Sequence, residues 1–440
     1  MADLITNIYN ALNPFEPLKP DDPAYVDCQD VRGDADVCRD LGREIIRSDR
    51  NTCQLYAGHR GAGKSTELLR LKAYLEANGC RVVYFAAIGD EGSVDPEDAE
   101  YTDILLACTR YLLEDLKDAD PRPLVGWLEE RWKVLKDIGQ TEVEFDKLDV
   151  QGKLLQFAQL STSIRAIPTQ RQKIRKLLNP HTVTLLEALN QFIQDAKQKL
   201  PKGSDRLVMI ADNLDRIVTI RDDDGRSNLD EIYLDRGDQL RGLACHLVYT
   251  VPISLVYSSR ASSLADNYGS PAMLPMIMVR TPDGELHESG YRSLVSILEK
   301  RVHRFAPEAK LESEIFSSEA VLQHLCLASG GHARQLLHLA KYAINYTDSL
   351  PIAEQAVQRA ISILRDDYRR TVQEGEWDVL ASVAKTHQFK HEDTHLDLLF
   401  RRCLLEYRIL TSEGGITRWC DINPLIRDIP EFKACSEKES

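Results

Sequence analysis

The chain of 440 residues lacks the features that mark several large classes of protein. It has no C-x-x-C pair and no paired histidine spacing, and its ten cysteines are scattered. This pattern favours reduced, mostly buried thiols and indicates neither a zinc site nor a disulfide framework. No run of about 18 apolar residues occurs, and no apolar run follows a basic start, so we expect neither a membrane span nor secretion.

A surplus of basic residues is also missing. Lysine and arginine number 55 against 69 aspartates and glutamates, which gives a formal net charge of −14 at pH 7. This balance argues against a surface that mainly coats nucleic acid, although a local basic patch is compatible with it. An acidic charge balance is usual for cytosolic proteins, and we expect a cytoplasmic protein. With 43% hydrophobic residues the chain can bury a proper core, and its length suits two or three domains.

The most informative stretch is Gly58–Ser65, Gly-His-Arg-Gly-Ala-Gly-Lys-Ser, which fits the P-loop pattern G-x-x-x-x-G-K-[S/T]. A short buried strand is predicted before it at 54–57, and apolar residues at helical spacing follow it. Strand, glycine turn and helix are the context that the motif requires. We predict that a nucleotide is bound by Gly58, His59, Arg60, Gly61, Ala62, Gly63, Lys64, Ser65 and Thr66.

The chemistry of a triphosphate explains these residue types. Backbone N–H groups must wrap the phosphates closely, and only glycine lets the chain turn that sharply with no Cβ in the way. The N-terminus of the following helix then faces the anion. Lys64 would place its charge on the β- and γ-phosphates, and the hydroxyl of Ser65 would bind Mg²⁺.

Two further strands end in polar residues. The predicted strand at 207–211 leads into Asp212, and a carboxylate at the end of a buried strand beside a P-loop is where Mg²⁺ is held, directly or through water. Asp212 is therefore the predicted metal-side residue. The predicted strand at 246–250 ends in Thr250, whose hydroxyl could hold the attacking water or reach the γ-phosphate.

The order of patterns along the chain predicts an α/β core with five mostly parallel strands, followed by helices and a small C-terminal domain. The fifth strand is expected at 276–280. Residues 118–182 fit no strand of a nucleotide fold and are predicted to form a charged helical insertion. The predicted domains are an extended lead-in at 1–36, a core at 37–285, a helical lid at 286–372, and a winged helix with a tail at 373–440.

The lead-in has prolines at positions 14, 17, 20 and 23, which predict extended chain and no packed helix. In many P-loop domains such a segment lies over the adenine, so Val26 and Arg32 are candidate base contacts, with simple cover of the core as the alternative. The insertion carries a basic run at 165–176. Such a run is typical of a solvated helix face, and nucleic-acid contact is the alternative.

Taken together, the motifs resemble AAA+ ATPases, in the branch shared by origin-recognition initiators and STAND signalling ATPases. The resemblance rests on Walker A at 58–65, Walker B at 207–212, a sensor-1 position at Thr250, a lid with a sensor-2 arginine at Arg334 in Gly-Gly-His-Ala-Arg, and a C-terminal winged helix. It implies ATP with Mg²⁺ and a homo-oligomer whose arginine finger reaches a neighbouring subunit's γ-phosphate. Arg260 occupies the family-like place for that finger, and Arg241 and Arg236 compete with it.

One position departs from the family pattern. Members that hydrolyse ATP quickly follow the Walker B aspartate with glutamate, which orients the attacking water, whereas here Asn213 follows. Asparagine cannot accept a proton. Asp215 could take the role, and if it cannot reach, the protein would bind ATP well and hydrolyse it slowly. That suits a switch better than a motor.

Three functions follow from these patterns. The favoured one is a regulatory ATPase in which ATP closes the lid through Arg334 and changes an oligomeric or signalling state, and the resemblance implies a setting in bacterial defence or mobile elements. The second is a DNA-binding initiator or transposition regulator. Because the second winged-helix helix, predicted at 395–406, offers only Arg401 and Arg402 as basic residues, a protein partner is favoured over DNA. The third is a nucleotide-dependent scaffold without hydrolysis.

Overall fold

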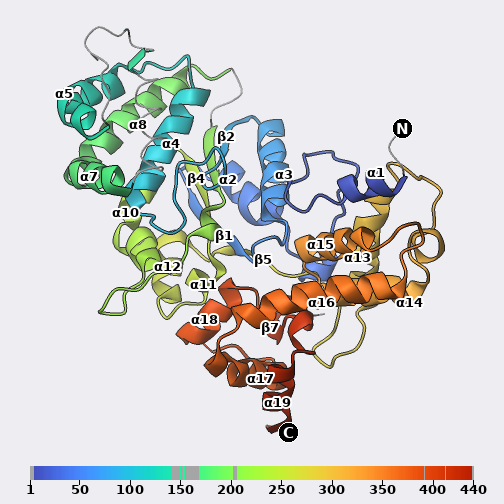
Figure 1. Ribbon diagram of the computed structural model, residues 1–440. Helices are drawn as coiled ribbons and strands as arrows, with labels where there is room; N and C mark the ends of the chain where they lie inside the picture. Colours follow the sequence, from blue (N-terminus) through green and yellow to red (C-terminus); the bar gives the residue numbers. More distant parts are fainter. Residues whose placement is uncertain are drawn as a thin grey trace. The chain divides into compact units, whose positions relative to one another are not determined.

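The computed structural model describes residues 4–139, 149, 152–153, 168–201, 206–390, 392–411 and 413–438 (Figure 1). The chain divides into two compact units. Unit 1 contains residues 1–36, 58–69 and 273–440, and unit 2 contains residues 37–57 and 70–272. The P-loop (residues 58–65) therefore belongs to the same unit as the N-terminal segment and the C-terminal third of the chain.

A five-stranded sheet has the strand order β2-β3-β4-β1-β5. The pairs β2–β3, β3–β4 and β1–β4 are parallel, which confirms the predicted α/β class. The residues of β4 are all buried, as expected for a parallel strand covered on both faces. The strands are β1 Cys53–Gly58, β2 Cys80–Ala86, β3 Arg206–Asp212, β4 His246–Val251 and β5 Ala272–Leu274.

The fifth strand lies earlier than predicted. It ends at Leu274, and the apolar residues 276–279 that suggested a strand form an irregular buried connection. Pro275 has no N–H to donate, and Met278 bonds instead to the carbonyl of Val31. Ile277 and Val279 are buried in the apolar core of unit 1, so the hydrophobic run reflects burial and not strand pairing.

The described part of the insertion in unit 2 is helical, as predicted. It consists of α5 (Arg122–Gly139) and α7 (Pro168–Leu178), and α8 (Thr182–Gln198) follows. The helix α5 packs against α7 and α8, and α7 packs against α4 (Tyr101–Asp115) (Figure 1). Buried leucines at 124 and 128, four residues apart on one face of α5, show why this helix packs here.

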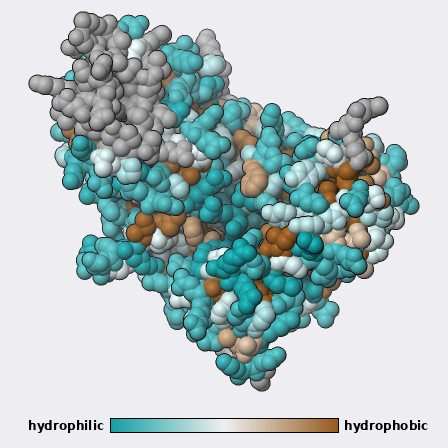
Figure 2. Space-filling model, viewed as in Figure 1, coloured by the Kyte–Doolittle hydropathy of each residue, from teal (hydrophilic) through white to brown (hydrophobic). Residues whose placement is uncertain are grey.

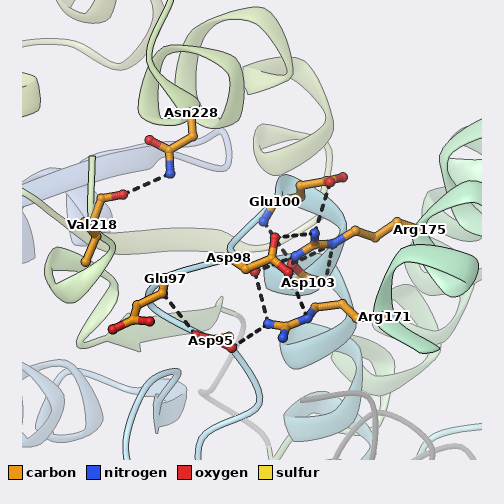
Figure 3. A network of polar contacts seen from close by, with 9 residues as sticks. All are labelled: Asp95, Glu97, Asp98, Glu100, Asp103, Arg171, Arg175, Val218 and Asn228. Atoms are coloured by element: carbon orange, nitrogen blue, oxygen red, sulfur yellow. Dashed lines mark hydrogen bonds and ion pairs between the residues drawn. The ribbon is translucent and has the colours of Figure 1, made fainter. Parts of the chain in front are cut away.

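The basic run of the insertion is not a uniformly solvated face. Arg171 and Arg175 are only 2% and 5% exposed, and both guanidinium groups point into the loop before α4 (Figure 3). Arg175 pairs with Asp98 at 2.7 Å and also with Glu100 and Asp103, while Arg171 pairs with Asp95 and Asp98. Lys173 and Lys176 are exposed, and residue 165 lies outside the described residues. We call the two arginines and their acidic partners the α7 ion-pair network.

Unit 1 is built around four lid helices: α13 (Glu288–Val302), α14 (Glu319–Ala328), α15 (Ala333–Asn345) and α16 (Glu354–Thr371). Their apolar faces form one core cluster, and the N-terminal residues Ile8 and Leu12 are buried in it. Ile8 lies in helix α1 (Leu4–Ala11), and Leu12 directly follows it. The prediction of an extended lead-in is therefore wrong for residues 4–11. The prolines begin only at residue 14, and apolar residues at helical spacing precede them.

The C-terminal part has the predicted order of two helices and a hairpin. It comprises α17 (Trp377–Thr386), α18 (Asp393–Phe400), the antiparallel strands β6 (Leu404–Leu410) and β7 (Ile416–Ile422), and α19 (Pro430–Lys438). The second helix is shorter than predicted. It ends at Phe400 because Arg402 adopts a left-handed backbone with φ +65°, after which the chain enters β6.

The surface is mainly polar on the face shown in Figure 2, where hydrophobic residues form separate patches. Within the described ranges, no helix is both long enough and apolar enough to span a membrane.

Candidate functional site

The P-loop has the backbone conformation for which its glycines are suited. Gly58, Gly61 and Gly63 have φ values of +148°, +89° and +114°, which residues with a side chain rarely adopt. A Cβ on Gly61 would also lie 2.7 Å from Cε1 of His332. At Gly63 the space is open, since only a guanidinium nitrogen of Arg32, 4.0 Å away, comes near. The loop path therefore depends on glycine at these positions.

The ammonium group of Lys64 is buried within the loop, and the residue is 5% exposed. It donates hydrogen bonds to the carbonyl oxygens of Gly58 at 2.7 Å and His59 at 2.8 Å. The predicted phosphate-binding charge is thus held by the backbone of the loop itself. Helix α3 (Lys64–Ala77) begins at this residue and carries Ser65 and Thr66 in its first turn.

The N-terminal segment is anchored to the P-loop. Arg32, which is 7% exposed, donates to the carbonyl of Ala62 at 2.8 Å and to that of Pro275 at 2.6 Å. Earlier in the same segment, the N–H of Leu18 donates to the hydroxyl of Thr66 at 3.1 Å. Val26 packs against the apolar core of the lid. Contact of Val26 and Arg32 with a base stays a prediction, while the contact of Arg32 with the loop backbone is a structural fact.

The Gly-Gly-His-Ala-Arg segment of the lid is hydrogen-bonded to the P-loop. The side chain of His332 caps α15, because its Nδ1 accepts the N–H of Gln335 at 3.0 Å. Its Nε2 must then carry the proton, which it donates to the carbonyl of Arg60 at 2.7 Å. The N–H of Arg334 donates to the carbonyl of Gly61 at 3.2 Å. The predicted sensor-2 arginine therefore lies at the P-loop, and its Nε donates to the carbonyl of Pro14.

A second histidine joins the P-loop to the C-terminal hairpin. The Nε2 of His59 accepts the N–H of Glu406, in β6, at 3.0 Å. Burial, together with the nearby charges of Lys64 and Arg402, lowers the pKa of His59 to about 3. Burial also lowers the pKa of His332 well below its ordinary value. Both imidazoles are therefore neutral at neutral pH, as their hydrogen bonds require.

In unit 2, Asp212 ends β3 and is 1% exposed. Its carboxylate accepts the hydroxyl of Tyr84, on β2, at 2.8 Å and the N–H of Asn213 at 2.6 Å. Asn213 is in the left-handed region with φ +67°, and its side-chain amide donates to the carbonyl of Ile88. Sequence reasoning missed Tyr84. A hydroxyl-bearing residue inside an apolar strand next to the predicted metal strand was the available signal.

Thr250 holds the turn that carries the acidic residues. It is fully buried, and its hydroxyl accepts the N–H of Leu214 at 2.9 Å and lies 3.4 Å from the carbonyl of Ala211. Asp215 lies in this turn, within the 3₁₀ helix Leu214–Arg216, and is 5% exposed. The structure thus places Thr250, on β4, against the turn that follows Asp212 and carries Asp215. A role for Thr250 toward water or the γ-phosphate stays a prediction.

The three candidate arginine fingers have different surroundings in unit 2. Arg260 pairs with Asp235 at 3.0 Å, and its side chain is 41% exposed. Arg241 donates to the carbonyl of Asn267 at 2.7 Å, so it is part of the local packing. The guanidinium of Arg236 lies 5.5 Å from the ring centre of Tyr101. The identity of a finger stays a prediction.

No protein-family model and no curated protein matches the chain. Its structure is similar to that of the Orc1 protein of Aeropyrum pernix in complex with DNA, with 15% identity, 97% of each chain covered and a TM-score of 0.37. It is also similar to Cdc6p from Pyrobaculum aerophilum, with 13% identity, 98% of each chain covered and a TM-score of 0.41. A third similar structure is the Walker-type ATPase paby2304 of Pyrococcus abyssi, with 12% identity, 94% of this chain and 98% of that chain covered, and a TM-score of 0.39.

At this level of identity and TM-score, the similarities say nothing about what this chain binds or does. The candidate site rests on the residues and contacts of the chain itself.

Proposed function

We propose that this protein is an ATP-binding regulatory ATPase with slow turnover, in which the P-loop controls a conformational or oligomeric switch. One observation carries the proposal: residues 59–61 of the P-loop are hydrogen-bonded to the lid through His332 and Arg334 and to the hairpin through Glu406. A change in the loop must therefore preserve or break bonds to both regions. This is the connection that a nucleotide-driven switch needs.

The chain's own groups fit a nucleoside triphosphate with Mg²⁺. The glycine backbone leaves room at Gly63, and Lys64 supplies a buried positive charge inside the loop. We propose that Ser65 and Asp212 hold the metal ion. This assignment follows the Walker A and Walker B patterns of the sequence. When bound, the ion would neutralise charge on the phosphates.

The energy for switching comes from contacts that differ between two states, because a ligand shifts a balance only by its differential affinity. Lys64 now donates to the carbonyls of Gly58 and His59. A phosphate would take over this donor, and the backbone around His59 would lose two charge-assisted bonds. Since His59 also accepts from Glu406, this rearrangement acts on the bond between the P-loop and the hairpin.

Slow hydrolysis follows from the turn after β3. The amide of Asn213 donates to the carbonyl of Ile88, and it cannot act as a base toward water. Asp215 is the remaining acid of this turn, and we propose it as the residue that orients the attacking water. Positioning and charge neutralisation by the P-loop remain, so binding is expected to be stronger than turnover is fast.

A protein partner is favoured over DNA for the C-terminal hairpin. Leu410 and Ile416 face each other at its tip and are 44% and 50% exposed. Arg401 is paired with Glu376, and Arg171 and Arg175 are buried, so few of the predicted basic contacts are available to phosphates. An apolar tip suits a protein surface. A role in bacterial defence or in mobile elements rests on the motif resemblance alone.

The test is ATP binding and steady-state hydrolysis with Mg²⁺, with particle mass measured with and without ATP. Lys64→Ala should lose binding. Asp215→Asn should keep binding and lose turnover, whereas Asp224→Asn, an exposed acid in the same unit, should behave as the wild type. Absence of ATP binding by the wild type would refute the proposal. Binding without turnover in the wild type would leave the nucleotide-dependent scaffold.

A further inference from the structure

Unit 1 contains a cavity of about 390 Å³ between the lid helices α15 and α16 and the end of α18. Its size is within the range of small-molecule sites. The charged residues of its lining are four arginines and one carboxylate, apart from any charge on its histidines: Arg60, Arg334, Arg401, Arg402 and Asp367. The rings of Phe400 and Tyr342 also line it.

The positive charges of this cavity are only partly matched by acids. Arg401 pairs with Glu376 and donates to the carbonyl of Thr371 at 2.8 Å. By contrast, the guanidinium of Arg402 makes no hydrogen bond or ion pair with any residue that the structure describes. Asp367 is exposed and lies 4.0 Å from Arg370, which already pairs with Asp366. The lining thus holds four guanidinium groups and one carboxylate, and within the described residues that of Arg402 has no ion-pair partner.

The backbone at Arg402 strengthens this observation. Its φ of +65° lies in the left-handed region, where glycine or asparagine is favoured and a long side chain is strained. Glycine would end α18 at lower cost. Because the guanidinium of Arg402 makes no hydrogen bond or ion pair with a described residue, local packing does not account for an arginine at this strained position. A need for the side chain at the cavity would account for it.

The histidines beside the cavity are affected both by burial and by its arginines. Burial lowers the pKa of His338, which lines the cavity, and the charges of Arg334, Arg402 and Lys341 lower it further. Arg402 has the same effect on the pKa of His332 after burial. These imidazoles therefore stay neutral and do not add charge, while an anion entering the cavity would be attracted.

We propose that this cavity binds a phosphate-bearing small molecule, with Arg402 as the main anchor and Arg60 and Arg334 as further donors. Guanidinium groups bind phosphate oxygens through paired N–H donors, and the aromatic rings can contact an organic group. This site goes beyond the proposed binding of ATP by the P-loop. Because its lining comes from the P-loop, the lid and α18, its ligand would hold these three segments in one arrangement.

The phosphate could belong to a separate molecule or to a nucleotide held by the P-loop, and Lys64→Ala distinguishes the two sources. The experiment measures the thermal midpoint with and without pyrophosphate at low salt, in the Lys64→Ala background. Binding to the folded state raises the midpoint. We expect a rise of several degrees in Lys64→Ala and in Lys64→Ala with Arg292→Ala, an exposed control arginine, and no rise in Lys64→Ala with Arg402→Gly.

Arg402→Gly should fold, because glycine adopts this φ without strain, and Arg402→Asn is the second variant if it does not. A missing rise in Lys64→Ala, or an equal rise in the Arg402 variant, would overturn the cavity site. These outcomes are separate from the proposed ATPase function. That function is tested by ATP binding and turnover in the wild type, and Arg402 is not required for those measurements.

Discussion

Two of the places where this molecule holds buried or half-buried arginines differ in their surroundings. In the α7 ion-pair network of unit 2, Arg171 and Arg175 are matched by four carboxylates (Figure 3). In the cavity of unit 1, Arg402 has no such partner among the described residues, and Asp367 is the one lining acid. A charge removed from water must be paired. The α7 ion-pair network therefore stabilises the fold, whereas the cavity is suited to an anionic ligand.

The largest expected effect is a loss of stability in the α7 ion-pair network. Arg175→Met should lower the free energy of unfolding of unit 2 by about 3–5 kcal/mol, because it leaves a buried carboxylate without its partner. That carboxylate is Asp103. Burial raises the pKa of Asp103, and Arg175 opposes this. Urea unfolding measures the change.

The matched control is Arg402→Met, which breaks no ion pair and should cost less than about 1 kcal/mol. Equal losses in the two variants would show that the arginines of both clusters are structural, and the contrast between them would disappear.

A smaller effect concerns pH. The folded pKa of His59 is about 3, below its ordinary value of 6.5, so the unfolded chain binds more protons between these values. The contribution of His59 to the free energy of unfolding should therefore be fully present above pH 6.5. It should fall as the pH drops, by roughly 2 kcal/mol by pH 5 for this one residue. His332 has the same sign of shift and adds to the loss.

His59→Gln keeps an acceptor for the N–H of Glu406 but does not titrate. Its unfolding free energy should depend less on pH than that of the wild type between pH 7 and 5. Identical pH profiles would show that these histidines do not determine the acid sensitivity of unit 1.

The smallest expected effect is a gain in stability. Arg402→Gly should raise the free energy of unfolding by up to about 1 kcal/mol, since a left-handed residue with a side chain costs about 1–2 kcal/mol and glycine loses more entropy on folding. Thermal unfolding without ligand measures it. A clear loss of stability would mean that Arg402 has a structural role like that of Arg175.

The sequence predicted the parts of the molecule that depend on local patterns. The α/β class, the helical insertion in its described parts and the two-helix and hairpin order at the C-terminus are confirmed. Helix α1 was missed because the prolines from position 14 onward predict extended chain, whereas the residues before them have the apolar spacing of a helix. The fifth strand was misplaced because burial and strand pairing give the same apolar run at 276–279.

The contacts around the P-loop were beyond sequence reasoning for a physical reason. His332 and Arg60 are 272 positions apart, and Glu406 and His59 are 347 apart. Periodicity reports only neighbours along the chain. The i, i+4 spacing of Arg171 and Arg175, with an acidic loop earlier in the chain, was a signal for the α7 ion-pair network that could have been used.

The bonds between the P-loop and its neighbours provide natural probes of motion. The amide hydrogens of Arg334 and Glu406 are donated to residues 61 and 59 of the P-loop. An amide exchanges with solvent only when its bond opens. Two amides, one in the lid and one in the hairpin, therefore report on the opening of the same short loop, and their hydrogen-exchange rates show whether the two regions release it together or one at a time.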